Sequence, residues 1–361
     1  MTMPAEHTTP GSQVGIEGAP VGRVIVVIPT LNEARHIVTV LHSLLPGAGR
    51  IGATIVVVDG GSSDGTRTLV RAEAARHPGI ILLHNPRRLQ AAAINLAVAH
   101  FDKTIDWIIR ADAHAGYPDD YCDTLLAEAR RTGAASVVVR MRTIGTTFLQ
   151  RNITAAQNAL FGNGGSAHRG GGQGRFVEHG HHALMRADAF KAVGGYDETF
   201  SHNEDAELDQ RLIKAGFRIW LTGATAMDYY PRDSLIGLAR QYFHFGAGRC
   251  ATAWKHPGSI RARHLILIGL APLALLAGLA PLSGLFAVPL VLWLVTCLLA
   301  GLLTALKMKQ ADLMLSGVAG AVMQMAWSAG FWRRLLANSA AKLTGRVSPR
   351  RSGQVMMGED L

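Results

Sequence analysis

The sequence predicts an α/β domain with a mostly parallel β-sheet flanked by helices, followed by α-helical transmembrane segments. Two patterns carry this prediction. From residue 24 to residue 109, short aliphatic runs alternate with segments of helical periodicity, which is typical of a parallel sheet covered on both faces. Farther along, residues 264–306 contain no Asp, Glu, Lys or Arg. That stretch is too long for a soluble core helix and long enough for two bilayer crossings.

The first part of the chain repeats a strand and helix pattern. Aliphatic runs at 24–28, 54–58, 80–83 and 107–109 predict four buried strands, and the segments between them predict helices. In the first helix, apolar side chains recur every three or four residues and form one face: Ile37, Val40, Leu41, Leu44 and Leu45. Parallel strands joined by right-handed crossovers bind ligands at their carboxyl ends. We therefore expect functional residues directly after the strands.

The composition divides the chain into four regions. We expect a disordered leader at 1–20, rich in Pro, Gly, Thr and Ala, and a catalytic domain at 21–250. Juxtamembrane and transmembrane or interfacial helices follow at 251–334, and a basic cytoplasmic tail follows at 335–361. A glycine-rich stretch inside the catalytic domain, 162–174, predicts either a mobile loop near a site or a flexible linker.

Three apolar stretches are candidate membrane helices. Residues 265–281 and 285–306 predict two crossings joined by an uncharged turn. The third stretch, 313–332, is ambiguous, because a third crossing would place the basic tail outside, against the positive-inside tendency. We therefore favour an interfacial or re-entrant position for it.

The net charge of +10 indicates a membrane surface and not a nucleic acid. No aromatic and basic nucleic-acid motif is present, and many basic residues lie next to the apolar stretches: Arg240, Arg249, Lys255, Arg261, Arg263, Arg333, Arg334, Lys342, Arg346, Arg350 and Arg351. The three cysteines have no paired spacing, and no secretory signal pattern is present. We expect the catalytic domain in the cytosol, on the inner face of the plasma membrane.

The first two predicted strands end in candidate nucleotide-binding residues. The first runs into PTLNE at 29–33, which lacks the glycines of a dinucleotide fold and excludes a nicotinamide-dependent dehydrogenase. Glu33 could face a base or ribose, or could be a first-turn acid favoured by the helix dipole. Asp59 follows the second strand and could accept a hydrogen bond from a base or ribose. A turn near a helix N-cap is sufficient to account for an aspartate at position 64.

The fourth predicted strand leads to a candidate metal site. Asp112 and His114 are two residues apart and point to the same side, so both could bind one divalent cation that bridges a diphosphate. An isolated Asp-x-His spacing is often incidental. Arg110 precedes them and could help to neutralise the diphosphate.

Two acids begin a later helix and are candidates for catalysis. Glu204 and Asp205 lie at its N-terminus, where the dipole favours an ionised carboxylate that can take a proton from an attacking hydroxyl. Acids at helix starts also occur for stability alone.

Taken together, these motifs resemble the inverting glycosyltransferases of family 2, which have the GT-A fold. The resemblance covers roughly residues 23–250. It is strongest to the bacterial exopolysaccharide glucosyltransferases of the succinoglycan type, whose chains also end in hydrophobic segments. The matching motifs are P-x-x-N-E at 29–33, V-V-D-G-x-S-x-D-G-T at 57–66, D-x-H at 112–114, G-G-Y-D-E at 194–198 and E-D at 204–205.

The resemblance implies a role for each site residue. Glu33 and Asp59 would hold the base and ribose, Asp112 would bind Mg²⁺ or Mn²⁺, and Asp205, beside Glu204, would be the general base. We expect six further residues to contact substrate: Pro29, Asp64, Arg88, Arg110, Gln241 and Arg249.

Two departures from the family pattern affect these expectations. His114 replaces the second acid of the metal site and supplies no negative charge. The Q-x-x-R-W element of processive relatives is reduced to QYFHF at 241–245, which favours single-sugar addition over polymerisation.

The resemblance implies transfer of a sugar, expected to be glucose from a UDP-sugar, to a lipid-linked or polysaccharide acceptor. A sugar nucleotidyltransferase is one alternative, although it would require a glycine-rich phosphate loop with Lys or Arg after the first strand. A non-catalytic membrane scaffold is the other, motivated by His114.

Overall fold

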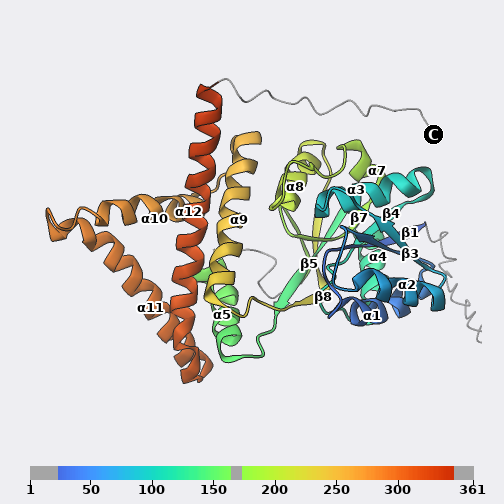
Figure 1. The fold of residues 1–361 in the computed structure, drawn as a ribbon, viewed down its shortest axis with the longest axis horizontal. Coiled ribbons are helices and arrows are strands. Elements are labelled where there is room, and N and C mark those ends of the chain that lie inside the picture. The colour runs from blue at the N-terminus through green and yellow to red at the C-terminus, as the bar shows by residue number, and fades with distance from the viewer. Residues whose placement is uncertain (1–22, 164–172, 345–361) are drawn as a thin grey trace, which may run out of the picture.

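The computed structural model describes residues 23–163 and 173–344. The predicted leader, most of the glycine-rich stretch and the end of the predicted tail lie outside the described residues. Within these ranges, helices flank an eight-stranded sheet, and a group of long helices stands at one side of it (Figure 1).

The strands alternate with helices along the first half of the chain. The strands are β1 (Val24–Thr30), β2 (Thr54–Asp59), β3 (Ile80–His84), β4 (Trp107–Arg110), β5 (Ser136–Thr143), β6 (Arg175–Val177), β7 (His181–Arg186) and β8 (Ile219–Tyr229). The helices up to the sheet's last strand are α1 (Ile37–Arg50), α2 (Thr66–Arg76), α3 (Gln90–Phe101), η1 (Asp102–Thr104), α4 (Tyr121–Thr132), α5 (Phe148–Asn158), α6 (Leu160–Asn163), α7 (Ala187–Ala192) and α8 (Glu204–Lys214). The remaining helices are α9 (Leu235–Lys255), α10 (Ala262–Ala277), η3 (Gly284–Ala287), α11 (Val288–Met308), η4 (Ala311–Leu315) and α12 (Ser316–Leu343).

The sheet is mixed, with strand order β3-β2-β1-β4-β7-β5-β8-β6. Strands β3, β2, β1 and β4 run parallel, as do β5 and β8. Strand β7 is antiparallel to β4 and β5, and β6 is antiparallel to β8. The predicted α/β class with a mostly parallel sheet is confirmed, and the four predicted strands correspond to β1–β4.

Alternate side chains of β1 enter cores on opposite faces of the sheet. Val26 packs in the cluster that includes α1 and α4, whereas Val27 packs in the cluster that includes α3 and α8. A central strand buried on both faces explains why its sequence is a continuous aliphatic run. Because packing on both faces holds the strands in place, the loops at the carboxyl ends of the parallel strands lie together on one side of the domain.

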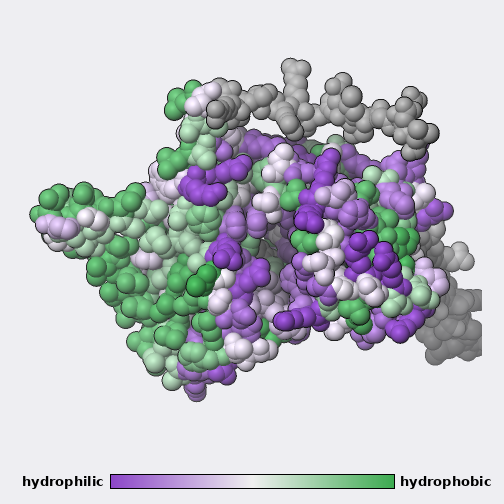
Figure 2. All heavy atoms as spheres, in the orientation of Figure 1, coloured by the Kyte–Doolittle hydropathy of each residue, from purple (hydrophilic) through white to green (hydrophobic). Residues whose placement is uncertain are grey.

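The apolar part of the chain forms a helical layer beside this domain. Two helical segments are long and apolar enough to cross a membrane, Gly284–Met308 and Ala311–Leu343. The first of them, which contains α11, is only 11% buried, and the apolar surface that it forms with α10 is visible in Figure 2. The second contains α12, is 56% buried and packs along α9. Membrane association is therefore consistent with the composition of these helices.

Two helix boundaries differ from the predicted ones. The first apolar helix, expected at 265–281, is α10 and ends at Ala277, because the chain turns before Pro281. Helix α12 continues through the predicted boundary at residue 334 and ends at Leu343. Alanine and leucine residues after Arg334 support this extension, since both are strong helix formers.

Glycines allow α9 and α12 to approach closely. A Cβ atom at Gly330 of α12 would lie 1.9 Å from the carbonyl oxygen of Phe243 in α9, and one at Gly246 of α9 would lie 1.8 Å from the carbonyl oxygen of Trp327. Neither backbone has room for a methyl group. The contact between the two helices therefore depends on both glycines.

We predict that Gly330→Ala separates α9 from α12 and lowers the free energy of unfolding by about 1–3 kcal/mol, the usual cost of overpacking. Thermal unfolding of the purified protein in detergent measures the change. Gly269→Ala is the matched control, because Gly269 lies in α10 with nothing within 4 Å of an added Cβ. Equal melting temperatures for the two variants would contradict the close-packing account.

Candidate active site

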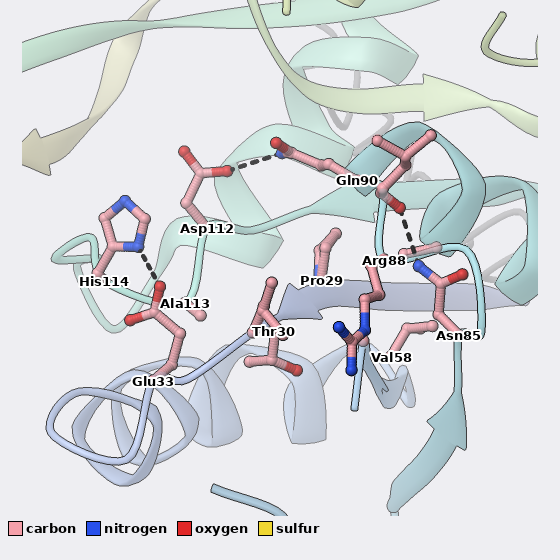
Figure 3. A pocket seen from close by; sticks show the side chains of 14 residues that line it. Pro29, Thr30, Glu33, Val58, Asn85, Arg88, Gln90, Asp112, Ala113 and His114 are labelled. Atoms are coloured by element: carbon pink, nitrogen blue, oxygen red, sulfur yellow. Dashed lines mark hydrogen bonds and ion pairs between the residues drawn. The ribbon is translucent and has the colours of Figure 1, made fainter. Parts of the chain in front are cut away.

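The loops after β1, β3 and β4 enclose a pocket at the carboxyl ends of the parallel strands (Figure 3). Five residues predicted from the sequence line it: Pro29, Glu33, Arg88, Asp112 and His114. The loop after β3 and the start of α3 add two polar residues that the sequence analysis did not single out, Asn85 and Gln90.

Asp59 lies between two residues that line the pocket, Val58 and Gly60, and holds its own loop. The side chain is 1% exposed, and Oδ1 accepts hydrogen bonds from the backbone N–H groups of Gly61 and Ser62 at 2.9 and 3.0 Å. Oδ2 accepts one from the hydroxyl of Ser62. Gly61 adopts the left-handed region with φ +86°, which a glycine accepts without strain. The structure therefore assigns Asp59 a loop-holding role, and its contact with a base or ribose stays a prediction.

Asp64 and Glu33 are connected through the neighbouring loops. Asp64 accepts hydrogen bonds from the backbone N–H groups of Ala34 and Thr66, and a further bond from the Thr66 hydroxyl is the largest cause that lowers the pKa of this acid. The same hydroxyl accepts a bond from the Glu33 N–H at 2.9 Å. Asp64 lies outside the pocket and fixes the segment that carries Glu33.

Arg110 lies among three carboxylates, one of which, Asp112, lines the pocket. Its side chain is 5% exposed, and Nη1 donates a hydrogen bond to Oδ1 of Asp205. Nη2 lies 3.6 Å from Oδ1 of Asp112 and 3.8 Å from Oε1 of Glu204. Burial alone would lower the pKa of Arg110, but these carboxylates hold it well above its ordinary value.

The two acids at the start of α8 differ in protonation. Burial and the adjacent Asp205 raise the pKa of Glu204 to about 7. Burial also opposes ionisation of Asp205, but Arg110 and His182 hold the pKa of Asp205 well below its ordinary value. Asp205 is therefore ionised at neutral pH and able to accept a proton, whereas Glu204 is only partly ionised there.

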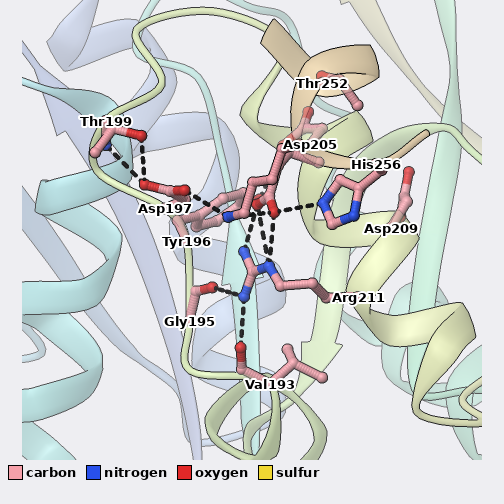
Figure 4. A network of polar contacts seen from close by, with 12 residues as sticks. Val193, Gly195, Tyr196, Asp197, Thr199, Asp205, Asp209, Arg211, Thr252 and His256 are labelled. Carbon is pink, nitrogen blue, oxygen red and sulfur yellow. Dashed lines mark hydrogen bonds and ion pairs between the residues drawn. The ribbon is translucent and has the colours of Figure 1, made fainter. Parts of the chain in front are cut away.

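A buried ion-pair network fixes the position of α8. Glu207, fully buried, accepts hydrogen bonds from Arg211 at 2.6 Å and from His256 at 2.9 Å. Arg211 also donates to the carbonyl oxygens of Val193 and Gly195, as Figure 4 shows. The network joins α8 to the preceding turn and to the end of α9, and so holds the helix that carries Asp205.

Two histidines of β7 reach the site and were missed by sequence reasoning. Nε2 of His181 lies 3.5 Å from Oδ2 of Asp112, and the fully buried His182 is hydrogen-bonded to the hydroxyl of Tyr196 at 2.8 Å. The one available signal was the density of histidines in EHGHH at 178–182. Strand β7 pairs with β4, and that pairing brings His181 beside Asp112, while His182 lies 3.6 Å from Oδ1 of Asp205.

Gln241 and Arg249, expected to contact substrate, lie on α9 and do not line the pocket. The side-chain N–H of Gln241 donates to the hydroxyl of Tyr229 at 2.8 Å. Arg249 forms no hydrogen bond or ion pair with the described residues, and burial lowers its pKa to about 10. Contacts from these two residues to the diphosphate or the acceptor stay predictions.

Asp112 and His114 suit a divalent cation shared with a diphosphate. His181, Arg110 and His114 hold the pKa of Asp112 below its ordinary value despite burial, so the acid is ionised. Nδ1 of His114 lies 2.8 Å from Oε1 of Glu33 (Figure 3). The hydrogen bond to Glu33 raises the pKa of His114, so the ring must lose the proton on Nε2 before that nitrogen can bind a metal, while Nδ1–H still donates to Glu33. One carboxylate and one imidazole leave the other positions to phosphate oxygens and water, as Mg²⁺ sites commonly do.

Known proteins are similar to this chain in sequence and in fold. The model of the family described as "Glycosyl transferase family 2" matches residues 25–194. The chain is 50% identical over 312 residues to "Succinoglycan biosynthesis protein ExoA" of Rhizobium meliloti, covering 86% of this chain and 94% of the relative. The chain belongs to glycosyl transferase family 2.

More distant similarities agree with this assignment. This family 2 glycosyltransferase is 28% identical to the "Pre-mycofactocin glycosyltransferase" of Mycobacterium tuberculosis, over 65% of this chain and 48% of the relative. It superposes on mannosyltransferase PcManGT of Pyrobaculum calidifontis, solved with GDP-Man and Mn²⁺, with a TM-score of 0.58, 21% identity and 87% coverage of each chain. The fold is therefore GT-A, as predicted, and the enzyme is a glycosyltransferase and not a nucleotidyltransferase.

Proposed function

We propose that this enzyme adds one sugar, by inversion, from a nucleotide-sugar to a membrane-bound saccharide in exopolysaccharide biosynthesis. The observation that carries the proposal is the position of Asp205: an ionised carboxylate held by Arg110, which also contacts Asp112 of the donor pocket. The 50% identity to the succinoglycan biosynthesis protein supports the pathway class. We extend the proposal to a UDP-sugar, with glucose as the sugar, and to a lipid-linked or polysaccharide acceptor.

The proposed reaction is a single displacement. Asp205 takes the proton of an acceptor hydroxyl while that oxygen attacks the anomeric carbon from the face opposite the nucleotide. The bond between the anomeric carbon and the diphosphate oxygen breaks, and the diphosphate leaves with the electron pair. A positioned base contributes roughly 10² to 10⁴ in rate.

The nucleotide-sugar would be held by residues at or after the ends of four strands, β1, β2, β3 and β4. Glu33 and Asp59 would support the base and ribose, and Arg88 would lie against the nucleotide. Asp112 and His114 would hold Mg²⁺ or Mn²⁺, which when bound would neutralise charge on the leaving diphosphate.

The proposed location is the cytoplasmic face of the inner membrane, with two crossings. The exposed apolar side chains of α10 and α11 would enter the bilayer, whereas α12 would lie at its surface because it packs along α9 and α5. Basic residues at 261–263 and 333–334 would stay on the cytoplasmic side, where nucleotide-sugars are available.

We predict that Asp205→Asn lowers kcat by about 10²-fold or more, because an amide cannot accept the proton. Nucleotide-sugar affinity should stay within about twofold, since the base acts on the acceptor. Rates with a panel of nucleotide-sugars, together with calorimetric binding, measure both quantities.

The control for this substitution is Asp188→Asn, an exposed acid at the start of α7 whose side chain is 70% exposed. It should leave both quantities unchanged. Turnover of Asp205→Asn within about tenfold of wild type would remove Asp205 from the role of base. Absence of sugar transfer by the unmodified enzyme with every donor would favour the scaffold alternative.

We predict a definite labelling pattern for single cysteines in intact cells. Cysteines at Asp188 and Thr344 should be shielded from an impermeant thiol reagent, and one at Ser283, between α10 and η3, should react. Background should be low, since Cys122, Cys250 and Cys297 are all buried. Labelling at Thr344 but not at Asp188 would show that α12 crosses the membrane. If a cysteine at Ser283 reacts only after the cells are permeabilised, the turn between α10 and α11 does not reach the outer side of the membrane.

A further inference from the structure

Tyr196 connects the proposed catalytic base to a second, more deeply buried acid. Its side chain is 2% exposed. The hydroxyl oxygen lies 2.9 Å from Oδ1 of Asp205 and 2.8 Å from Nδ1 of His182. Nε2 of His182 lies 2.6 Å from Oδ1 of Asp209, whose side chain is fully buried. A continuous chain of hydrogen bonds thus runs from Asp205 through Tyr196 and His182 to Asp209.

The directions of these hydrogen bonds follow from the atoms involved. An ionised Asp205 can only accept, so the Tyr196 hydroxyl donates its one proton to Oδ1. The same oxygen must then accept from Nδ1–H of His182, and it also accepts from Arg110, 3.3 Å away. Nε2 of His182 faces a carboxylate as well, so one proton is shared between that nitrogen and Asp209. These hydrogen bonds are consistent with a buried pair of an imidazolium, His182, and a carboxylate, Asp209.

The charges around His182 support this pairing. Asp209 and Asp205 on α8 face the ring, while Arg110 on β4 and the neighbouring His181 oppose a positive charge there. Asp209 also accepts a hydrogen bond from His179 at 2.7 Å. Burial alone would lower the pKa of His182, but the two acids hold it above its ordinary value.

The chain of hydrogen bonds engages only one of the two carboxylate oxygens of Asp205. Oδ1 accepts from both Arg110 and Tyr196, whereas Oδ2 accepts no hydrogen bond from the described residues. Nδ1 of His181 lies 3.9 Å from Oδ2, and the other nitrogen of that ring faces Asp112. Oδ2 therefore lies on the side of the carboxylate that faces His181, and that ring in turn contacts Asp112, which lines the donor pocket.

We propose that Tyr196 is a positioning residue, which fixes Oδ1 of Asp205 with the support of the His182 and Asp209 pair and so presents Oδ2 to the acceptor hydroxyl. This inference rests on the proposed role of Asp205 as base. Tyr196 touches neither substrate in this account and acts through the carboxylate.

The test is Tyr196→Phe, which keeps the ring that packs on Phe190 and removes the hydroxyl. We expect kcat to fall about 10- to 100-fold, as for loss of a hydrogen bond to a charged group, with the donor KM unchanged. Because that bond favours the ionised form, its loss raises the pKa of Asp205. The acid limb of the kcat profile should therefore move to higher pH, which a purely structural defect would not produce.

Three companion variants make the result decisive. Tyr121→Phe removes another buried tyrosine hydroxyl, one that is not bonded to Asp205, and should keep the wild-type pH profile. Asp209→Asn should lower kcat in the same way as Tyr196→Phe and replaces it as the test if the Phe variant does not fold. Asp205→Asn is assayed in parallel: if it stays active, the proposed base is wrong. If it is inactive while Tyr196→Phe and Asp209→Asn keep wild-type kcat and pH profile, the positioning role alone is overturned.

Discussion

The active site depends on one permanent positive charge, Arg110, buried among acids that would otherwise repel one another. Moving an ion out of water costs several kcal/mol unless it is paired, and Arg110 is paired with Asp205, near Asp112 and Glu204. The pairing has unequal effects on its neighbours. Asp205, in direct contact, stays ionised, whereas burial and the charge of Asp205 raise the pKa of Glu204, which is farther from the guanidinium, to about 7. The guanidinium also joins the proposed base to the donor pocket through Asp112.

The rest of the molecule keeps this arrangement in place. Strand β4 pairs in parallel with β1 and ends at Arg110, and so sets the positions of Arg110 and Asp112. The buried Glu207 network joins α8 to the end of α9. Helix α9 in turn packs on α12 through Gly246 and Gly330. The apolar helices are therefore connected to α8, which carries the proposed base, by two buried contacts, and the orientation of the catalytic domain at a bilayer would follow from the same contacts.

Much of this could be predicted from the sequence, because strand ends and their acids are local features. To predict strands β1–β4 and the functional residues after them, one needs only the periodicity of the sequence and the rule that parallel sheets bind ligands at the carboxyl ends of their strands. What the sequence could not show was tertiary in origin. His181 and His182 enter the site because β7 inserts between β4 and β5, a pairing between distant segments. Asp59 accepts hydrogen bonds from its own turn, which a strand-end position could not distinguish from a ligand contact. Arg249 is basic and close to the apolar helices in sequence, yet it lies outside the donor pocket.

The most direct test of this account is the pH dependence of kcat for Arg110→Lys beside wild type. Lysine keeps the charge but loses the planar fork that reaches several carboxylates at once. The account predicts a lower kcat and an acid limb shifted to higher pH, because Asp205 would be less strongly held in its ionised form. A profile with the same acid limb, merely scaled in height, would contradict the claim that Arg110 sets the ionisation of the base.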